Sequence, residues 1–208
     1  MGSYKYQGLE PYLPQGALAL IEPLLNKYPL RVLITKPRKS KFGDYRFPRK
    51  GSSHRISVNG NLNPYHFLIT LIHEYAHLEA CVLFGKNINP HGDEWKETFR
   101  LCSVPFLEQN LFPKDVAQAF TNSLIKGYAS SASSLELMRV LKNYDIKDAD
   151  VFQHLEDLAE GEHFILNQKL FCKGAQSRKR FKCEDLRSGR FYMVHPLADV
   201  TIYNLKND

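Results

Sequence analysis

One long apolar segment, residues 64–84, constrains this chain more than any other part of its sequence. Asn63 followed by Pro64 is a favourable helix start, because asparagine caps a first turn and proline fits the first helical position. Gly85 is a suitable stop. The side chains between them are apolar on almost every side, which predicts a central buried helix of a soluble domain. Its interruptions by charged and polar residues argue against a membrane span. These interruptions include His66, His73, Glu74, His77 and Glu79.

Three of these residues form the pattern His-Glu-x-x-His: His73, Glu74 and His77. Histidines four residues apart lie one helical turn apart on one face, so both imidazoles can reach one metal ion. Glu74 is rotated by about 100° from His73, which lets it reach a metal-bound water without being a ligand. Zinc lowers the pKa of such a water to about 7, and a carboxylate can accept its proton during attack on a peptide carbonyl. The alternative is a buried helix with two hydrogen-bonded histidines and an incidental glutamate. Burying three such polar side chains on so apolar a helix costs free energy unless each has a partner.

A third histidine, His91, lies in a predicted loop just before another helix. This loop can fold back beside the first helix, so that His91 completes three nitrogen ligands and leaves a fourth position open. An open position is typical of a catalytic site, whereas four protein ligands are typical of a structural one. Gly92 would let the backbone turn tightly after the ligand. The alternative is a solvent-exposed loop histidine.

These motifs resemble the SprT-like family, whose best-known eukaryotic member is Spartan. The resemblance rests on residues 73–77 and 91–96, with residues 43–45 and 56–59 similar to the strands that precede the family's zinc helix. It covers roughly residues 14–110. It implies a zincin-like metalloprotease with one catalytic Zn²⁺ held by His73, His77 and His91, and with Glu74 as catalytic acid/base. It also implies action on proteins bound or crosslinked to DNA, which the spacing of the residues does not show.

We therefore expect an α+β fold in two parts. Residues 1–160 would form a compact zincin-like domain with the central helix and a small sheet. Residues 161–208 contain short alternating segments joined by Gly and Ser turns, which predicts a small β-rich module. The other predicted helices are 14–28, one starting near 93, 114–126 and 134–143, and the predicted strands of the first part are 30–35 and 55–59.

The cysteines of the second part do not complete a zinc site. SprT-like proteins often carry a zinc ribbon with two Cys-x-x-Cys pairs, but Cys172 and Cys183 each lack the second cysteine of a pair. Two thiolates cannot fill a tetrahedral site, and both His163 and His195 would have to join them. We expect a degenerate zinc-ribbon-like module without metal, held together by its apolar and aromatic side chains.

Charge is unevenly distributed, although the total is only +6. Lys and Arg gather in residues 1–60 and 163–208, which favours polyanion contact at both ends. In the C-terminal cluster, aromatic residues lie between the cations, as in nucleic-acid-binding surfaces; the alternative is a solvated positive face. Its members are Lys173, Arg178, Lys179, Arg180, Lys182, Arg187 and Arg190. A weaker cluster spans residues 36–50.

The leading hypothesis is a zinc-dependent endopeptidase acting on DNA-bound protein. It would be cytoplasmic, since the N-terminus has no apolar signal-peptide core, and nucleoid-associated if it binds DNA. A DNA-binding protein with a non-proteolytic zinc site and a metallohydrolase of non-peptide substrates are the alternatives. For a peptide substrate, we expect the predicted strand at residues 55–59 to be the sheet edge that pairs with it.

Overall fold

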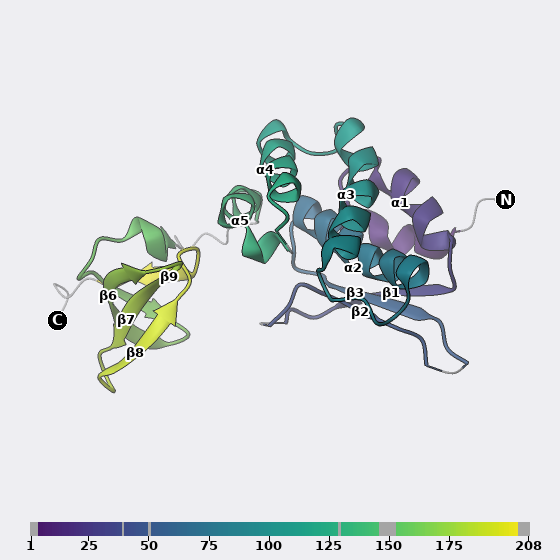
Figure 1. The fold of residues 1–208 in the computed structure, drawn as a ribbon. Coiled ribbons are helices and arrows are strands. Elements are labelled where there is room, and N and C mark those ends of the chain that lie inside the picture. The colour runs from purple at the N-terminus through teal and green to yellow at the C-terminus, as the bar shows by residue number, and fades with distance from the viewer. Residues whose placement is uncertain (1–3, 39, 50, 129, 146–152, 204–208) are drawn as a thin grey trace. The chain divides into compact units, whose positions relative to one another are not determined.

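A computed structural model describes residues 4–38, 40–49, 51–128, 130–145 and 153–203. The chain divides into two compact units, Met1–Asp145 and Ile146–Asp208 (Figure 1). The expected α+β class is confirmed. The division precedes the expected boundary between residues 160 and 161, because β4 (Gln153–His154) pairs with β9 (Asp199–Ile202) and Leu155 packs in the core of the second unit.

The first unit contains a three-stranded sheet with helices on one side (Figure 1). Its strands are β1 (Leu30–Thr35), β2 (Gly43–Arg46) and β3 (His54–Asn59), in the order β1-β3-β2. β3 runs parallel to β1 and antiparallel to β2. Ile56 and Val58 of β3 are fully buried, as expected for alternate residues that face a helical layer.

The expectation that residues 55–59 form a sheet edge is wrong. β3 is the central strand and its main-chain groups bond to β1 on one side and to β2 on the other. The strand at the edge beside the central helix is β2, which the alternation of apolar residues does not reveal because its sequence is Gly-Asp-Tyr-Arg.

The central helix α2 extends over Pro64–Phe84, as predicted. The Asn63 side chain accepts a hydrogen bond from the main-chain N–H of His66 at 3.0 Å, and Gly85 ends the helix with a φ of 89°. Judged only by length and composition, α2 could cross a membrane. However, 67% of its most apolar 18-residue stretch is buried inside the protein. α2 therefore lies in the core of the first unit.

The remaining helices complete the first unit around α2. α3 (Asp93–Glu108) packs along α2, and its Trp95 and Phe99 contribute to the shared core. The described helical segments besides α2 and α3 are η1 (Tyr4–Tyr12), α1 (Ala17–Asn26), α4 (Lys114–Ile125), η2 (Ser131–Ser133) and α5 (Leu135–Lys142).

The second unit is a six-stranded sheet with its own small core. The strands lie in the order β4, β9, β5 (His163–Leu166), β6 (Lys169–Ser177), β7 (Arg180–Asp185) and β8 (Arg190–Val194), and neighbouring strands in this order are antiparallel. Phe164, Phe171 and Val200 are among its buried residues. Its remaining described element is η3 (Leu155–Asp157).

Candidate metal centre

Three imidazole nitrogens converge on one point in the first unit. The Nε2 atoms of His73 and His77, one turn apart on α2, are 3.2 Å apart, and His91 Nε2 lies 3.1 Å from His77 and 3.3 Å from His73. Tetrahedral ligands at about 2.0–2.1 Å from a zinc ion would be separated by nearly these distances. Together these residues could hold a metal ion, and they are the cluster of metal-binding type found among the described residues.

His91 reaches this point through an unusual backbone conformation. Its φ is 61°, in the left-handed region, where non-glycine residues are uncommon and often functional. Gly92 has an extended backbone with φ −68°, so the turn that we expected at Gly92 occurs one residue earlier. Gly92 instead relieves crowding, because a Cβ there would lie 3.1 Å from the main-chain oxygen of Asn89, closer than an ordinary van der Waals contact.

The indole ring of Trp95 packs against the rings of all three histidines. Its ring centre lies 4.7 Å from that of His73, 5.0 Å from that of His77 and 4.7 Å from that of His91, and the side chain is fully buried. The sequence pattern placed Trp95 on a buried helix face but did not indicate that it contacts all three rings. Packing against one rigid indole limits the orientations open to each imidazole.

Burial keeps these histidines neutral, which is the state a metal ion requires. It lowers the pKa of His77 to about 4, with the charge of His91 adding to the effect. Burial also places the pKa of His73 well below its usual value and lowers that of His91. Each imidazole can therefore offer a lone pair near neutral pH.

Glu74 lies beside this triad in a tight contact with the edge strand. It is 6% exposed, and burial raises its pKa to about 8, with the charge of Asp44 acting in the same direction and the Tyr45 main-chain N–H opposing it. A Cβ added at Gly43 would overlap Glu74 Oε1 and lie 2.8 Å from Thr70 Cγ2. The glycine thus allows β2 to lie directly on the carboxylate. Sequence reasoning noted residues 43–45 only as part of a resemblance and missed this contact.

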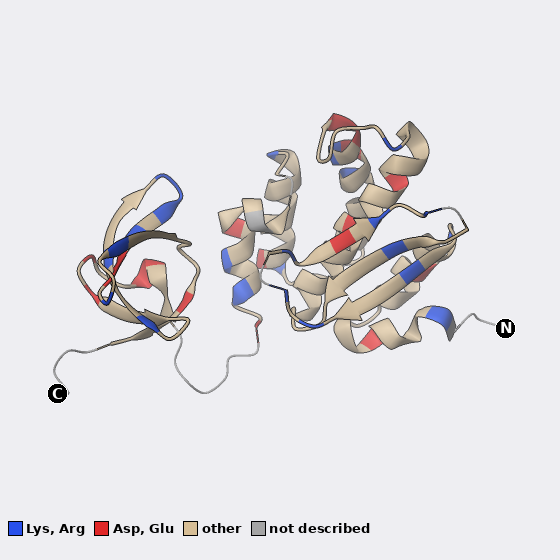
Figure 2. Cartoon of the chain, turned by 90° about the horizontal axis from the view of Figure 1, so that it is seen from below, with Lys and Arg blue, Asp and Glu red and all other residues tan. Residues whose placement is uncertain are grey.

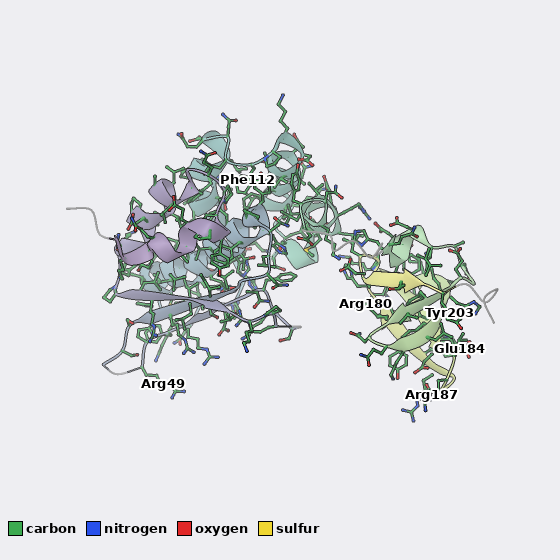
Figure 3. The ribbon with its side chains drawn as sticks, turned by 180° about the vertical axis from the view of Figure 1, so that it is seen from behind. Arg49, Phe112, Arg180, Glu184, Arg187 and Tyr203 are labelled. Carbon is green, nitrogen blue, oxygen red and sulfur yellow. The ribbon has the colours of Figure 1, made fainter. Side chains whose placement is uncertain are left out.

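The basic cluster of the second unit is largely solvent-exposed. Arg180 is the first residue of β7 and Arg187 lies in the turn that follows this strand. Both are exposed, and Figure 3 shows both side chains projecting from the sheet. Phe191 of β8 is 58% exposed and has the ammonium of Lys182 4.1 Å from its ring centre. The exposed cations of the cluster are Arg178, Lys179, Arg180, Lys182, Arg187 and Arg190.

Lys173 does not belong to that surface, contrary to the sequence-based expectation. It is 4% exposed, and its ammonium donates to the main-chain oxygens of Glu156, at 3.2 Å, and of Leu158. It also lies 4.1 Å from the ring centre of Phe181. The side chain points inward because it pairs across the sheet with buried Cys183.

Cys172 and Cys183 do not share a site. Cys172 pairs with Glu184, whereas Cys183 pairs with Lys173 on the same two strands. Since directly paired residues share a face and successive residues alternate, the two thiols point to opposite faces of the sheet. Among the described residues, no group of three metal-binding side chains includes either cysteine.

Comparisons with known proteins give a family match over the part of the chain that contains the three histidines. Residues 26–116 match the model of the SprT-like family. A 39-residue segment is 54% identical to Protein SprT of Pseudomonas fluorescens (strain SBW25), covering 18% of this chain and 24% of that protein. The chain thus spans about a quarter of the length of this curated relative. No solved structure matches the chain significantly.

Proposed function

We propose that this chain, which belongs to the SprT-like family through residues 26–116, is a zinc-dependent endopeptidase. The observation that carries the proposal is the triangle of His73, His77 and His91 nitrogens with Glu74 as the next residue on the same helix. Three neutral imidazoles form a donor set that suits zinc, and they leave a fourth position for solvent or substrate.

Each residue has a distinct role in the proposed reaction. The three histidines hold the metal, and Trp95 fixes the orientation of their rings. Zinc bound there would supply Lewis acidity and lower the pKa of water. The positive charge of a bound zinc ion would favour the ionised form of Glu74, against the effect of burial on its pKa. The ionised carboxylate would accept the proton of the attacking water as the bond between the water oxygen and the peptide carbon forms, and would then pass the proton to the amine nitrogen as the C–N bond breaks.

The strand β2 is the proposed docking edge for an extended peptide. It lies at the edge of the sheet, and Gly43 brings it against Glu74. An extended substrate that adds to this edge would bond through its main chain, as in other cases of β-strand addition, and would pass beside the carboxylate. This proposal replaces the expectation for residues 55–59.

We further propose DNA as a partner, so that the substrates are DNA-bound or DNA-crosslinked proteins. This part is supported by the family and by the exposed cations and aromatic rings of the second unit. Cytoplasmic location, with nucleoid association through DNA, follows as part of the same proposal. The second candidate, a DNA-binding protein with a structural zinc, is less favoured because the described residues offer a three-histidine set with no fourth side-chain ligand grouped with it.

Cleavage of a DNA-binding protein with and without DNA tests both parts. We expect the zinc-loaded chain to cleave it and the Glu74→Gln variant not to. Faster cleavage with single- or double-stranded DNA would support the DNA partner. DNA-independent cleavage would remove that partner while leaving the peptidase, and absence of cleavage by the zinc-loaded wild type under all conditions would favour the non-proteolytic alternative.

A further inference from the structure

The sheet of the first unit carries a row of arginines on the face opposite to α2. In the strand register, Arg31 of β1 lies beside Arg55 of β3, and Arg55 lies beside Arg46 of β2. Arg55 precedes buried Ile56, so alternation directs it to the other face, where the helices shown in Figure 1 do not cover the sheet. Viewed from that side, basic positions lie on neighbouring strands (Figure 2).

This face has few negative charges to balance its cations. Asp44 is the one carboxylate that the three strands contribute, and it already bonds Arg46 Nε and Lys41 Nζ, both at 2.8 Å. Among the described residues, Arg31 and Arg55 have no ion-pair partner. Arg38 lies across the same face and bonds the neutral groups of Ser57 and Asn59, at 3.1 and 2.8 Å.

Such a row is unfavourable for folding by itself. Like charges placed directly opposite one another in a sheet are destabilising. Nothing in the packing requires arginine at Arg31 or Arg46, because both side chains are exposed to solvent. A bound polyanion would turn the repulsion into attraction.

From this juxtaposition, we infer that the open face of the sheet binds the phosphate backbone of a nucleic acid. Guanidinium groups match phosphate oxygens with two parallel hydrogen bonds. Neighbouring strands are about 4.8 Å apart, so the row spans roughly 10 Å and can meet about three successive phosphates of one strand. Leu33 is the one apolar side chain that the three strands place on this face, and it is only partly exposed. Insertion into a lipid surface needs a larger apolar face, which favours nucleic acid over a membrane.

This surface belongs to the first unit and is separate from the metal centre of that unit. The sheet lies between it and α2, so binding there does not depend on the proposed peptidase activity. Its last member, Arg46, lies on β2, the strand that contacts Glu74 through Gly43. A nucleic acid bound to this face would therefore reach β2, the strand proposed to receive the substrate.

The test compares two triple variants of the full zinc-loaded chain by fluorescence anisotropy with labelled single- and double-stranded DNA across a salt series. One variant replaces Arg31, Arg46 and Arg55 by Gln. The matched control replaces Arg100, Lys114 and Lys126 by Gln, which removes the same charge from exposed helix positions. Circular dichroism and thermal melting verify that both variants fold.

We expect the row variant to lose at least about tenfold in affinity at 0.1 M salt. Its slope of log K against log salt should fall by about 2 with single strands and by about 2.7 with duplex, as expected for three lost phosphate contacts. The control should show less than half of either change. Equal effects of the two variants, or no effect of either, would overturn the inference. Equally tight and equally row-dependent binding of poly-glutamate or of anionic phospholipid vesicles would assign the face to another partner and would also overturn it.

Discussion

Gly43 of β2 lies against the carboxylate of Glu74, so closely that a methyl group at Gly43 would overlap Oε1. The contact joins the edge strand to the residue that follows the first histidine of the metal centre. It explains why a residue without a side chain begins β2. It also makes the position of Glu74 sensitive to a change outside the metal ligands.

Gly43→Ala should therefore lower peptidase activity while leaving zinc bound. The added methyl group must displace either β2 or the Glu74 side chain, and a shift of about 1 Å in a reacting group can cost on the order of 100-fold in rate. We expect kcat/KM to fall by about 10- to 100-fold with an unchanged zinc content. Gly8→Ala is the matched control, because a Cβ at Gly8 meets nothing within 4 Å. Unchanged kcat/KM for Gly43→Ala would show that the strand yields freely.

Glu74→Gln should separate zinc binding from chemistry. The amide has the size of the carboxylate but cannot accept the proton of the attacking water, and general acid–base catalysis contributes about 10²–10⁴-fold. We expect a loss of that size, with zinc content measured by atomic absorption remaining at one per chain. Glu79→Gln is a suitable comparison, because Glu79 is a buried carboxylate of the same helix that accepts a bond from Tyr75 at 2.8 Å. It should lower the melting temperature and leave kcat within a few-fold; a matching loss of kcat in Glu79→Gln would contradict a special role for Glu74.

The sequence predicts the metal centre better than the sheet that surrounds it. His73 and His77 follow from helical periodicity, because spacing along one helix fixes which side chains share a face. His91 required the additional assumption that its loop folds back, and the structure confirms that the three nitrogens meet. The contacts of Trp95 with these rings depend on how α3 packs on α2, which no local pattern specifies.

Strand order and side-chain direction were the parts that local patterns could not supply. β3 pairs directly with β1 although β2 lies between them in the sequence, so chain order wrongly indicated an edge at residues 55–59. The seven cations of the C-terminal cluster have the same chemistry, yet register turns Lys173 inward. Of the weaker cluster at 36–50, Lys39 and Lys50 lie outside the described residues, and Arg49 extends away from the domain (Figure 3).

His91→Asn should weaken zinc binding without disturbing the loop. Asparagine tolerates the left-handed conformation that His91 adopts with a φ of 61°, so the backbone can be retained while the ligand is lost. Loss of an outer partner of a ligand typically costs 10- to 100-fold in metal affinity, and we expect loss of the ligand itself to cost more than about 100-fold. Competition with a chromogenic chelator measures this affinity. His163→Asn in the second unit is the control, and zinc affinity equal to wild type in His91→Asn would exclude His91 as a ligand.

The free energy of unfolding of the metal-free protein should decrease as the pH is lowered, because of a buried histidine outside the metal centre. His66 is 4% exposed, and burial lowers its pKa to about 4, with the charge of Lys142 contributing. Its unfolded pKa is near 6.5, so the unfolded state binds a proton first as pH falls. The stabilisation is complete above pH 6.5 and declines between pH 6.5 and 4, by at most about 3 kcal/mol at 1.36 kcal/mol per unit.

His66→Gln tests this assignment, because glutamine can still bond Ser131 Oγ, which lies 3.0 Å from His66 Nε2. Urea denaturation at several pH values gives the free energy of unfolding. The metal-ligand histidines also titrate in this range, so the informative quantity is the difference between wild type and variant. We expect the pH dependence to be shallower in the variant below pH 6.5. Parallel curves would assign the acid sensitivity to other groups.

Lys173 and Lys182 should have opposite roles although they lie on neighbouring strands. Lys173→Met removes the buried ammonium that bonds the main-chain oxygens of Glu156 and Leu158. Unsatisfied buried acceptors cost about 1–3 kcal/mol each, so we expect a lower melting temperature and unchanged DNA affinity of the folded protein.

Lys182→Gln, at an exposed position beside the Phe191 ring, should leave the melting temperature unchanged and reduce DNA affinity. The slope of log K against log salt should be lower by about 0.7–0.9. Calorimetry and anisotropy on the same samples separate the two effects. Loss of DNA affinity in folded Lys173→Met would return Lys173 to the binding surface, and unchanged affinity and slope in Lys182→Gln would remove Lys182 from it.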